Sequence, residues 1–204
     1  MNNSINMIPS QRRIGLTGGV ASGKTTIANY ISKTKNIKIL DADIYSRKLI
    51  KPNTKQYDKI ISHFGKRIVD ISTKKLEINK QTLKKIIIED PNQRKWLENL
   101  LHPLIKESII KDCNKMKNEK VLLLVVPLLF EAKFDDMCTE IWLVKCGMKE
   151  QLKRLLKREK LNVSEAKQLI NLQLSYSDKA KKVNVILDNS NAQEKWKKKV
   201  ESLI

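Results

Sequence analysis

A glycine-rich segment near the amino end, RIGLTGGVASGKTT at residues 13–26, has the residue types and spacing of a phosphate-binding loop. It contains G-x-x-x-x-G-K-T, with Gly18, Gly23, Lys24 and Thr25 at the fixed positions. Glycines let backbone N–H groups turn toward phosphate oxygens, and the positive end of the following helix faces the same anion. The lysine of such a loop reaches the outer phosphates, and the threonine hydroxyl coordinates Mg²⁺. The motif therefore predicts binding of a nucleoside triphosphate with Mg²⁺.

The phosphate loop by itself does not define a reaction. The N-K-x-D motif that GTPases use for guanine does not occur in the sequence. ATPase motors usually carry an acid directly after a central apolar strand, whereas VLLLVV at 121–126 runs into Pro127, with Glu131 further on. Small-molecule kinases remain, and they need positioning, charge neutralisation and a base for the acceptor hydroxyl.

Two acids, Asp41 and Asp43, follow the second predicted strand. Ligands of open α/β sheets bind at the carboxyl ends of the strands. Because side chains alternate along an extended chain, both carboxylates could face the same way. One would then accept the proton of the acceptor hydroxyl, and the other would serve Mg²⁺ or water. A role as helix N-cap is an equal alternative from position alone.

Basic residues gather in MKEQLKRLLKRE at 148–159, where Arg154 and Arg158 are four residues apart and share a helix face. Such arginines could close over ATP and neutralise charge in the transition state. From spacing alone, a solvated amphipathic face is the favoured interpretation. His102, a lone histidine before Pro103, likewise favours a structural role when it is taken by itself.

The elements that must position these residues follow from apolar patterning and turn signals. The predicted strands are 12–17, 37–40, 121–126, 141–144 and 183–187. The predicted helices are 24–33, 54–64, one opening at Pro91, 148–160, 164–174 and 192–203. The region 44–117 is predicted to be mostly helical, with an interruption at Leu-His-Pro, 101–103. This order predicts an α/β fold with a mostly parallel sheet and a helical insertion.

Composition limits the class of protein. The 204 residues, 41% of them hydrophobic, suit one domain or one core with inserted subdomains. The net charge of +19 has three interpretations: nucleic-acid binding, a solvated lysine-rich surface, or attraction of an anionic phosphate substrate. No aromatic residues interleave with the lysines, which disfavours a dedicated nucleic-acid binder. Three irregularly spaced cysteines, no membrane-length apolar run and no secretory signal favour a reduced, cytoplasmic protein.

Taken together, the motifs resemble the dephospho-CoA kinase family. The pieces that carry the resemblance stand in the family's order over nearly the whole chain: IGLTGGVASGKTT, DADIYSR (41–47), WLENLLHPLI (96–105), VVPLLFE (125–131), QLKRLLKRE (151–159) and ILDNS (186–190). The resemblance implies that ATP phosphorylates the ribose 3′-hydroxyl of dephospho-CoA, the last step of coenzyme A synthesis. Related nucleoside or nucleotide monophosphate kinases and, less so, a nucleic-acid-binding NTPase are the alternatives.

The resemblance also implies an architecture and its boundaries. A P-loop NTPase-type core, a mostly parallel sheet flanked by helices, would comprise residues 10–43, 119–147 and 176–204. A helical acceptor-binding domain would comprise 44–118, and a helical lid 148–175. The implied partners are the small molecules ATP and dephospho-CoA, without nucleic acid or membrane, and the protein would be a monomer or a weak homo-oligomer.

Site residues come from the resemblance position by position. Asp43 looks like the catalytic base, with Lys24 and Arg154 as further catalytic residues. The implied ATP-binding residues are Gly19, Val20, Ala21, Ser22, Gly23, Lys24, Thr25, Thr26, Arg154, Arg158 and Asn189, with Thr25 also the Mg²⁺ ligand. The implied acceptor-binding residues are Thr17, Asp43, Arg47, His102 and Pro103. Three positions depart from the family pattern: Ala21 replaces a frequent glycine, Thr25 replaces the common serine, and Val183-Asn184 replaces a common Ala-Asp.

Overall fold

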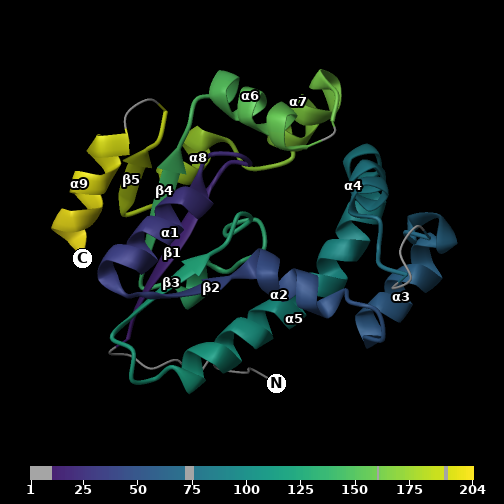
Figure 1. The fold of residues 1–204 in the computed structure, drawn as a ribbon, viewed down its shortest axis with the longest axis horizontal. Coiled ribbons are helices and arrows are strands. Elements are labelled where there is room, and N and C mark those ends of the chain that lie inside the picture. Colours follow the sequence, from purple (N-terminus) through teal and green to yellow (C-terminus); the bar gives the residue numbers. More distant parts are fainter. Residues whose placement is uncertain (1–10, 72–75, 160, 191–192) are drawn as a thin grey trace. The chain divides into compact units, whose positions relative to one another are not determined.

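The structure is a computed structural model that describes residues 11–71, 76–159, 161–190 and 193–204. Five parallel strands form one sheet in the order β2-β3-β1-β4-β5 (Figure 1). Their bounds are β1 Arg12–Gly18, β2 Lys38–Asp41, β3 Val121–Val125, β4 Glu140–Lys145 and β5 Val185–Asp188. The predicted α/β fold with a parallel sheet is therefore confirmed, and β1, which leads into the phosphate loop, is the central strand.

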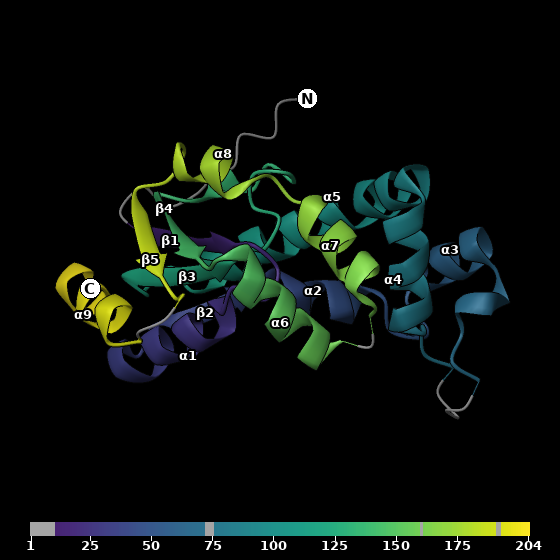
Figure 2. The same ribbon diagram turned by 90° about the horizontal axis from the view of Figure 1, so that it is seen from above.

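Helices cover both faces of the sheet, as the unbroken apolar sequence of β3 requires. On one face, α1 (Lys24–Lys35) and α9 (Gln193–Leu203) pack on alternate strand residues, and α8 (Tyr176–Ala180) lies over the opposite face (Figures 1 and 2). The core beneath α1 and α9 includes Ile14, Leu16, Ile27, Ile31, Trp142 and Trp196. This packing fixes the start of α1, and with it the phosphate loop, against the end of β1.

The chain divides into two compact units. One holds the sheet and comprises the described residues up to Ala42 and from Ile109 onward, and the other is Asp43–Ser108. The first unit contains α6 (Met148–Arg158) and α7 (Val163–Asn171) besides the helices that cover the sheet. The second unit contains α2 (Ala42–Leu49) from its second residue, α3 (Lys55–Phe64), α4 (Lys80–Glu89) and most of α5 (Pro91–Lys115). Two 3₁₀ turns, Lys66–Ile68 and Asp135–Met137, complete the elements.

The predicted interruption at Leu101–Pro103 is wrong, because α5 runs unbroken through Pro103. A proline inside a helix removes one backbone hydrogen bond and normally bends or breaks the helix. Here buried residues recur every four positions across it, at Leu97, Leu101 and Ile105. The burial of this stripe outweighs the local preference of the proline.

The premise that Asp41 and Asp43 lie on one extended segment is also wrong. Asp41 ends β2, and helix α2 begins at the next residue, Ala42, so Asp43 is in the first turn of a helix. Strand alternation therefore does not govern how the two carboxylates are oriented. Near the end of the chain, α7 stops at Asn171 rather than Leu174.

Other boundaries differ by small amounts or lie outside the described residues. The last strand begins at Val185 rather than Val183, and the short helix α8 was not predicted. The predicted first residue of the closing helix, at 192, lies outside the described residues, as does Lys160, the predicted end of the basic helix. Among the described residues, no helix is long and apolar enough to cross a membrane.

Candidate functional site

The phosphate loop leads into α1, and among the described residues the start of this helix has no side-chain cap. Its N-cap is Gly23, with φ 97° and ψ 22°, and within the described residues no side chain caps it and no acid lies in its first turn. By contrast, side chains cap α3, α4, α7 and α8, namely Thr54, Asn79, Asn162 and Ser175. An uncapped helix start concentrates N–H donors and partial positive charge, and so fits an anion.

A glycine at position 23 is favoured by its left-handed backbone and by the close approach of Asn189, the residue after β5. A Cβ atom on Gly23 would lie 2.0 Å from Asn189 Nδ2, and the left-handed φ adds strain for any other residue. Asn189, which is buried, donates from that Nδ2 to the Ser22 carbonyl over 2.8 Å. The predicted ATP-binding residue Asn189 is therefore held directly against the loop.

Lys24 lies over the loop that precedes it. Its Nζ donates to the carbonyls of Gly18 and Gly19, each over 2.9 Å. The side chain is largely buried, and its ammonium is bound to these two loop carbonyls. An ammonium in this position is ready to exchange carbonyl oxygens for phosphate oxygens.

Arg154 of α6 reaches the same loop. Its guanidinium donates to the carbonyls of Ser22 over 3.4 Å and Asn189 over 3.2 Å, and its Nε pairs with Glu150 Oε1 at 2.8 Å. The Glu150 pair, one helical turn away, orients the guanidinium toward the loop. Arg158, one turn further along α6, is exposed and donates to Glu159 over 3.2 Å. The structure thus brings Arg154 to the phosphate loop and leaves Arg158 at the end of its helix.

Three threonines near the loop differ in accessibility. Thr25 and Thr26 are exposed in the first turn of α1. Thr17, predicted to contact the acceptor, is fully buried, and its hydroxyl donates to the Pro127 carbonyl over 3.2 Å. A contact between Thr17 and an acceptor would require that bond to be exchanged.

The remaining predicted residues lie in the second unit. Asp43 and Arg47 are exposed, one turn apart on α2, and Arg47 Nε donates to the Asp43 carbonyl over 3.1 Å. His102 is half-buried and Pro103 exposed, both inside α5. Their relation to the phosphate loop stays a prediction.

Two glutamines that sequence reasoning missed bind the loop directly. Gln151 of α6 donates from Nε2 to the Val20 carbonyl over 2.9 Å, and Gln173 accepts from the Val20 N–H over 2.7 Å. Gln151 precedes the buried Leu155 by one turn, so its place on the buried helix face was readable from the sequence. For Gln173, which follows the end of α7, no local pattern signals the contact.

Three groups around the sheet have strongly shifted pKa values: Asp188, Cys113 and Cys138. At the carboxyl ends of β4 and β5, Lys145 Nζ lies 2.8 Å from Asp188 Oδ2. Hydrogen bonds from Lys145 and Ser190 hold the pKa of Asp188 at about 2. Burial raises the pKa of Cys113 to about 11 and of Cys138 to about 12, so neither thiol is an activated nucleophile. In the described ranges, no group of three His, Cys, Asp or Glu side chains could hold a metal ion.

A central parallel strand, a glycine loop and an uncapped helix define a protein of the P-loop nucleotide-binding class. The family model described as dephospho-CoA kinase matches residues 12–195. A Prochlorococcus marinus subsp. pastoris protein named dephospho-CoA kinase is 56% identical over 194 residues, which is 95% of each chain. The chain belongs to the dephospho-CoA kinase family.

Solved structures agree with this assignment. Dephospho-CoA kinase from Campylobacter jejuni superimposes with a TM-score of 0.65 at 25% identity, covering 94% of both chains. A Thermus thermophilus crystal structure gives a TM-score of 0.75 at 21% identity, covering 95% of this chain and 96% of the other. The second likeness is evidence for the fold alone.

Proposed function

We propose that this chain catalyses the ATP-dependent phosphorylation of the ribose 3′-hydroxyl of dephospho-CoA, giving CoA and ADP, the final step of coenzyme A biosynthesis. The observation that carries the proposal is the family match over residues 12–195, which includes the phosphate loop and α6. The fold adds support, because P-loop kinases work by positioning and charge neutralisation rather than by covalent chemistry.

In this proposal the loop 18–25 and the start of α1 hold the triphosphate. Lys24 gives up its bonds to the loop carbonyls and takes phosphate oxygens, while Arg154 exchanges the Ser22 and Asn189 carbonyls for phosphate oxygens in the same way. Both cations then lie where negative charge develops during transfer. Arg158 binds the nucleotide together with them in this proposal, as a residue of the proposed lid, 148–175.

Mg²⁺ neutralises phosphate charge when it is bound together with ATP. The hydroxyl of Thr25 is the protein group that would hold it, because it is exposed in the first turn of α1 and is an oxygen donor. Mg²⁺ prefers oxygen ligands and keeps several from water and substrate phosphates, so a single protein hydroxyl fits this ion.

The acceptor is bound in this proposal by the helical domain 44–118, with Asp43 at its boundary. Asp43 accepts the proton of the 3′-hydroxyl as the ribose oxygen forms its bond to the γ-phosphorus. The bond from that phosphorus to the oxygen bridging to the β-phosphate breaks, and ADP leaves. Arg47, His102 and Pro103 bind the acceptor in this proposal, and Thr17 contacts its reacting edge.

The high net charge fits a protein whose two substrates are both polyanionic, since a positive surface speeds their association. We expect the protein to act in the cytoplasm as a monomer or weak homo-oligomer. We do not expect it to bind nucleic acid. Size-exclusion chromatography with light scattering tests the oligomeric state.

An acceptor panel tests the function. The protein is supplied with ATP, Mg²⁺ and one acceptor at a time, either dephospho-CoA or a nucleoside or nucleotide monophosphate, and ADP release is measured. We expect dephospho-CoA to have the highest kcat/KM. A folded protein that does not turn over dephospho-CoA, or that prefers a nucleotide acceptor, would contradict the proposal.

The base assignment is tested by Asp43→Asn. If Asp43 takes the proton, kcat falls by about 10² or more while the ATP dissociation constant stays nearly unchanged. Asp58→Asn is the matched control, because Asp58 is also exposed in the first turn of a helix, α3. Unchanged kcat in the Asp43 variant would move the role to Asp41 or elsewhere.

A further inference from the structure

The backbone of Val20, in the middle of the phosphate loop, is bound at both its N–H and its carbonyl by side chains from distant elements. Its N–H donates to Gln173 Oε1 over 2.7 Å, and its carbonyl accepts from Gln151 Nε2 over 2.9 Å. A backbone N–H can only donate and a carbonyl can only accept, so the orientation of both amides is fixed by the loop itself.

The loop sequence leaves room for this contact. A Cβ atom on Gly19 would lie 2.1 Å from Gln151 Nε2, so only glycine at position 19 lets the amide reach Val20. Gln151 is itself buried in α6, and its helix also carries Arg154. The position of α6 and the shape of the loop are therefore linked through one side chain.

Gln173 is held in place from behind. The N–H of its neighbour Leu174 donates to Glu131 Oε1 over 2.9 Å, and the same oxygen lies 3.0 Å from Nζ of Lys179, whose side chain is 1% exposed. Burying such a pair brings little net stability, since desolvation offsets the attraction. Its effect is to tie the segment between α7 and α8 to the segment after β3, and so to fix where Gln173 stands.

We propose that Gln151 and Gln173 are positioning residues that hold the phosphate loop in its nucleotide-binding shape. The loop includes Ala21 at φ 56° and Gly23 at φ 97°, conformations that a free loop would exchange for others. Two amides on Val20 remove that freedom before the nucleotide arrives, so less ordering is left for binding to accomplish. The inference rests on the proposed function, because it takes the loop to bind the phosphates of ATP.

Gln→Glu substitutions separate hydrogen bonding from charge. Gln173→Glu keeps an acceptor for the Val20 N–H, whereas Gln151→Glu replaces the donor and sets an oxygen against the Val20 carbonyl. Each adds one negative charge beside the loop. We expect the ADP dissociation constant to rise about three- to tenfold more in Gln151→Glu than in Gln173→Glu. Gln168→Glu is the control for one added negative charge on an exposed part of α7.

A neutral substitution, Gln173→Leu, removes the acceptor without adding charge. We expect faster hydrogen exchange of the Val20 amide and an ADP dissociation constant raised about three- to tenfold. Adenosine affinity should stay unchanged, since adenosine has no phosphates. A general loss of structure would weaken adenosine as well, and thermal melts of each variant report it separately.

Several outcomes would overturn the inference. Equal effects of the two Gln→Glu variants would show that charge alone matters. Tighter ADP binding by Gln173→Leu would show that the amide competes with the nucleotide instead of preparing its site. The unsubstituted protein is assayed first: ADP binding without phosphorylation of dephospho-CoA would count against the proposed function, and ADP affinities of the variants would still decide this inference.

Discussion

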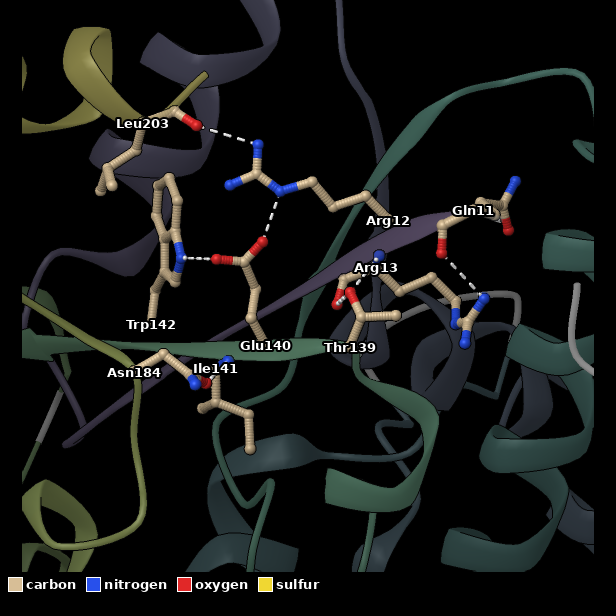
Figure 3. Close-up of polar contacts among 9 residues, drawn as sticks. All are labelled: Gln11, Arg12, Arg13, Thr139, Glu140, Ile141, Trp142, Asn184 and Leu203. Carbon is tan, nitrogen blue, oxygen red and sulfur yellow. Dashed lines mark hydrogen bonds and ion pairs between the residues drawn. The ribbon is translucent and has the colours of Figure 1, made fainter. Parts of the chain in front are cut away.

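The two ends of the central sheet use polar groups in opposite ways. At the amino ends, Glu140 accepts hydrogen bonds from Arg12 and, over 2.9 Å, from Trp142 Nε1, and Arg12 also donates to the Leu203 carbonyl over 2.9 Å (Figure 3). Asn184 pairs with Ile141 through both its backbone and its side chain. At the carboxyl ends, Lys24 and Arg154 donate to backbone carbonyls of the phosphate loop and of Asn189, and Arg154 also pairs with Glu150 on its own helix.

The difference separates stability from function. The amino-end groups are closed into a network of complementary partners, so a ligand has nothing to add. The carboxyl end combines cations on carbonyls with an uncapped helix start, and anionic oxygens would serve all of these donors better. Asn184, a departure from the family pattern, belongs to the amino end, where its amide oxygen accepts from Ile141 N as a carboxylate would.

Lys24→Ala, at the carboxyl ends of the strands, should have the largest effect on activity. Loss of the cation that neutralises the outer phosphates should lower kcat/KM by about 10²–10³. The free energy of unfolding should change by less than about 1 kcal/mol, because the hydrogen bonds of Lys24 to the Gly18 and Gly19 carbonyls contribute little net stability. Steady-state kinetics and urea unfolding measure the two quantities, with Lys33→Ala at the exposed end of α1 as the control. Near-normal activity would show that the loop has been misinterpreted.

Glu140→Gln should instead weaken the hydrogen-bond network at the amino ends of the strands and lower the stability of the fold. The side chain is 20% exposed and has two hydrogen-bonded partners, so the substitution should cost about 1–3 kcal/mol of unfolding free energy. Values of kcat and KM should stay within about twofold of the unsubstituted protein, since surface-network changes remote from a site act on stability. A large loss of activity at full folding would mean that the two ends are coupled.

Lowering the pH tests both ends of the sheet, because each end holds a carboxylate with a lowered pKa: Glu140 at the amino end and Asp188 at the carboxyl end. Burial raises the pKa of Glu140, but hydrogen bonds from Arg12 and Trp142 outweigh it, so its pKa lies below the usual value. A carboxyl group whose pKa is lower in the folded state than in the unfolded state, where it is about 4, stabilises the fold above that unfolded pKa. This contribution is lost as the pH falls. Stability should therefore decline between pH of about 5 and about 2, the pKa of Asp188.

The two carboxylates should share this decline unequally. The Lys145–Asp188 pair is 42% and 44% exposed, so solvent screens it and it contributes little. Glu140→Gln should therefore flatten the acid dependence of unfolding more than Asp188→Asn does. Urea unfolding at a series of pH values measures both slopes, and an equal effect of the two variants would contradict the ranking.

Ala21→Gly should give the smallest effect. Ala21 has φ 56°, and a left-handed conformation costs a residue with a Cβ about 1–2 kcal/mol. Glycine relieves that strain but adds about 0.4–1 kcal/mol of unfolded-chain entropy, so the net gain should be about 0–1.6 kcal/mol. Thermal unfolding measures it. A marked destabilisation would show that the methyl group packs usefully in the loop.

Local signals carried much of the prediction. The helix 54–64 is confirmed as α3, with Thr54 as its cap and Gly65 closing it, because cap residues act within one turn. The predicted interruption at Leu101–Pro103 is wrong because the burial of a long apolar stripe outweighs the helix-breaking preference of Pro103. The prediction that Asp41 and Asp43 lie on one extended segment is wrong because helix α2 begins at Ala42, between them.

The sequence by itself determined the phosphate loop, the parallel sheet and the family, since a glycine loop and the helix after it act within a few residues of one another. Only the tertiary structure decided what surrounds the loop. Gln151 and Gln173 meet Val20 across separations of 131 and 153 residues, and Asn189 meets Ser22 across 167. Contacts of that range depend on how helices and loops pack against the five-stranded sheet, and no local residue pattern encodes them.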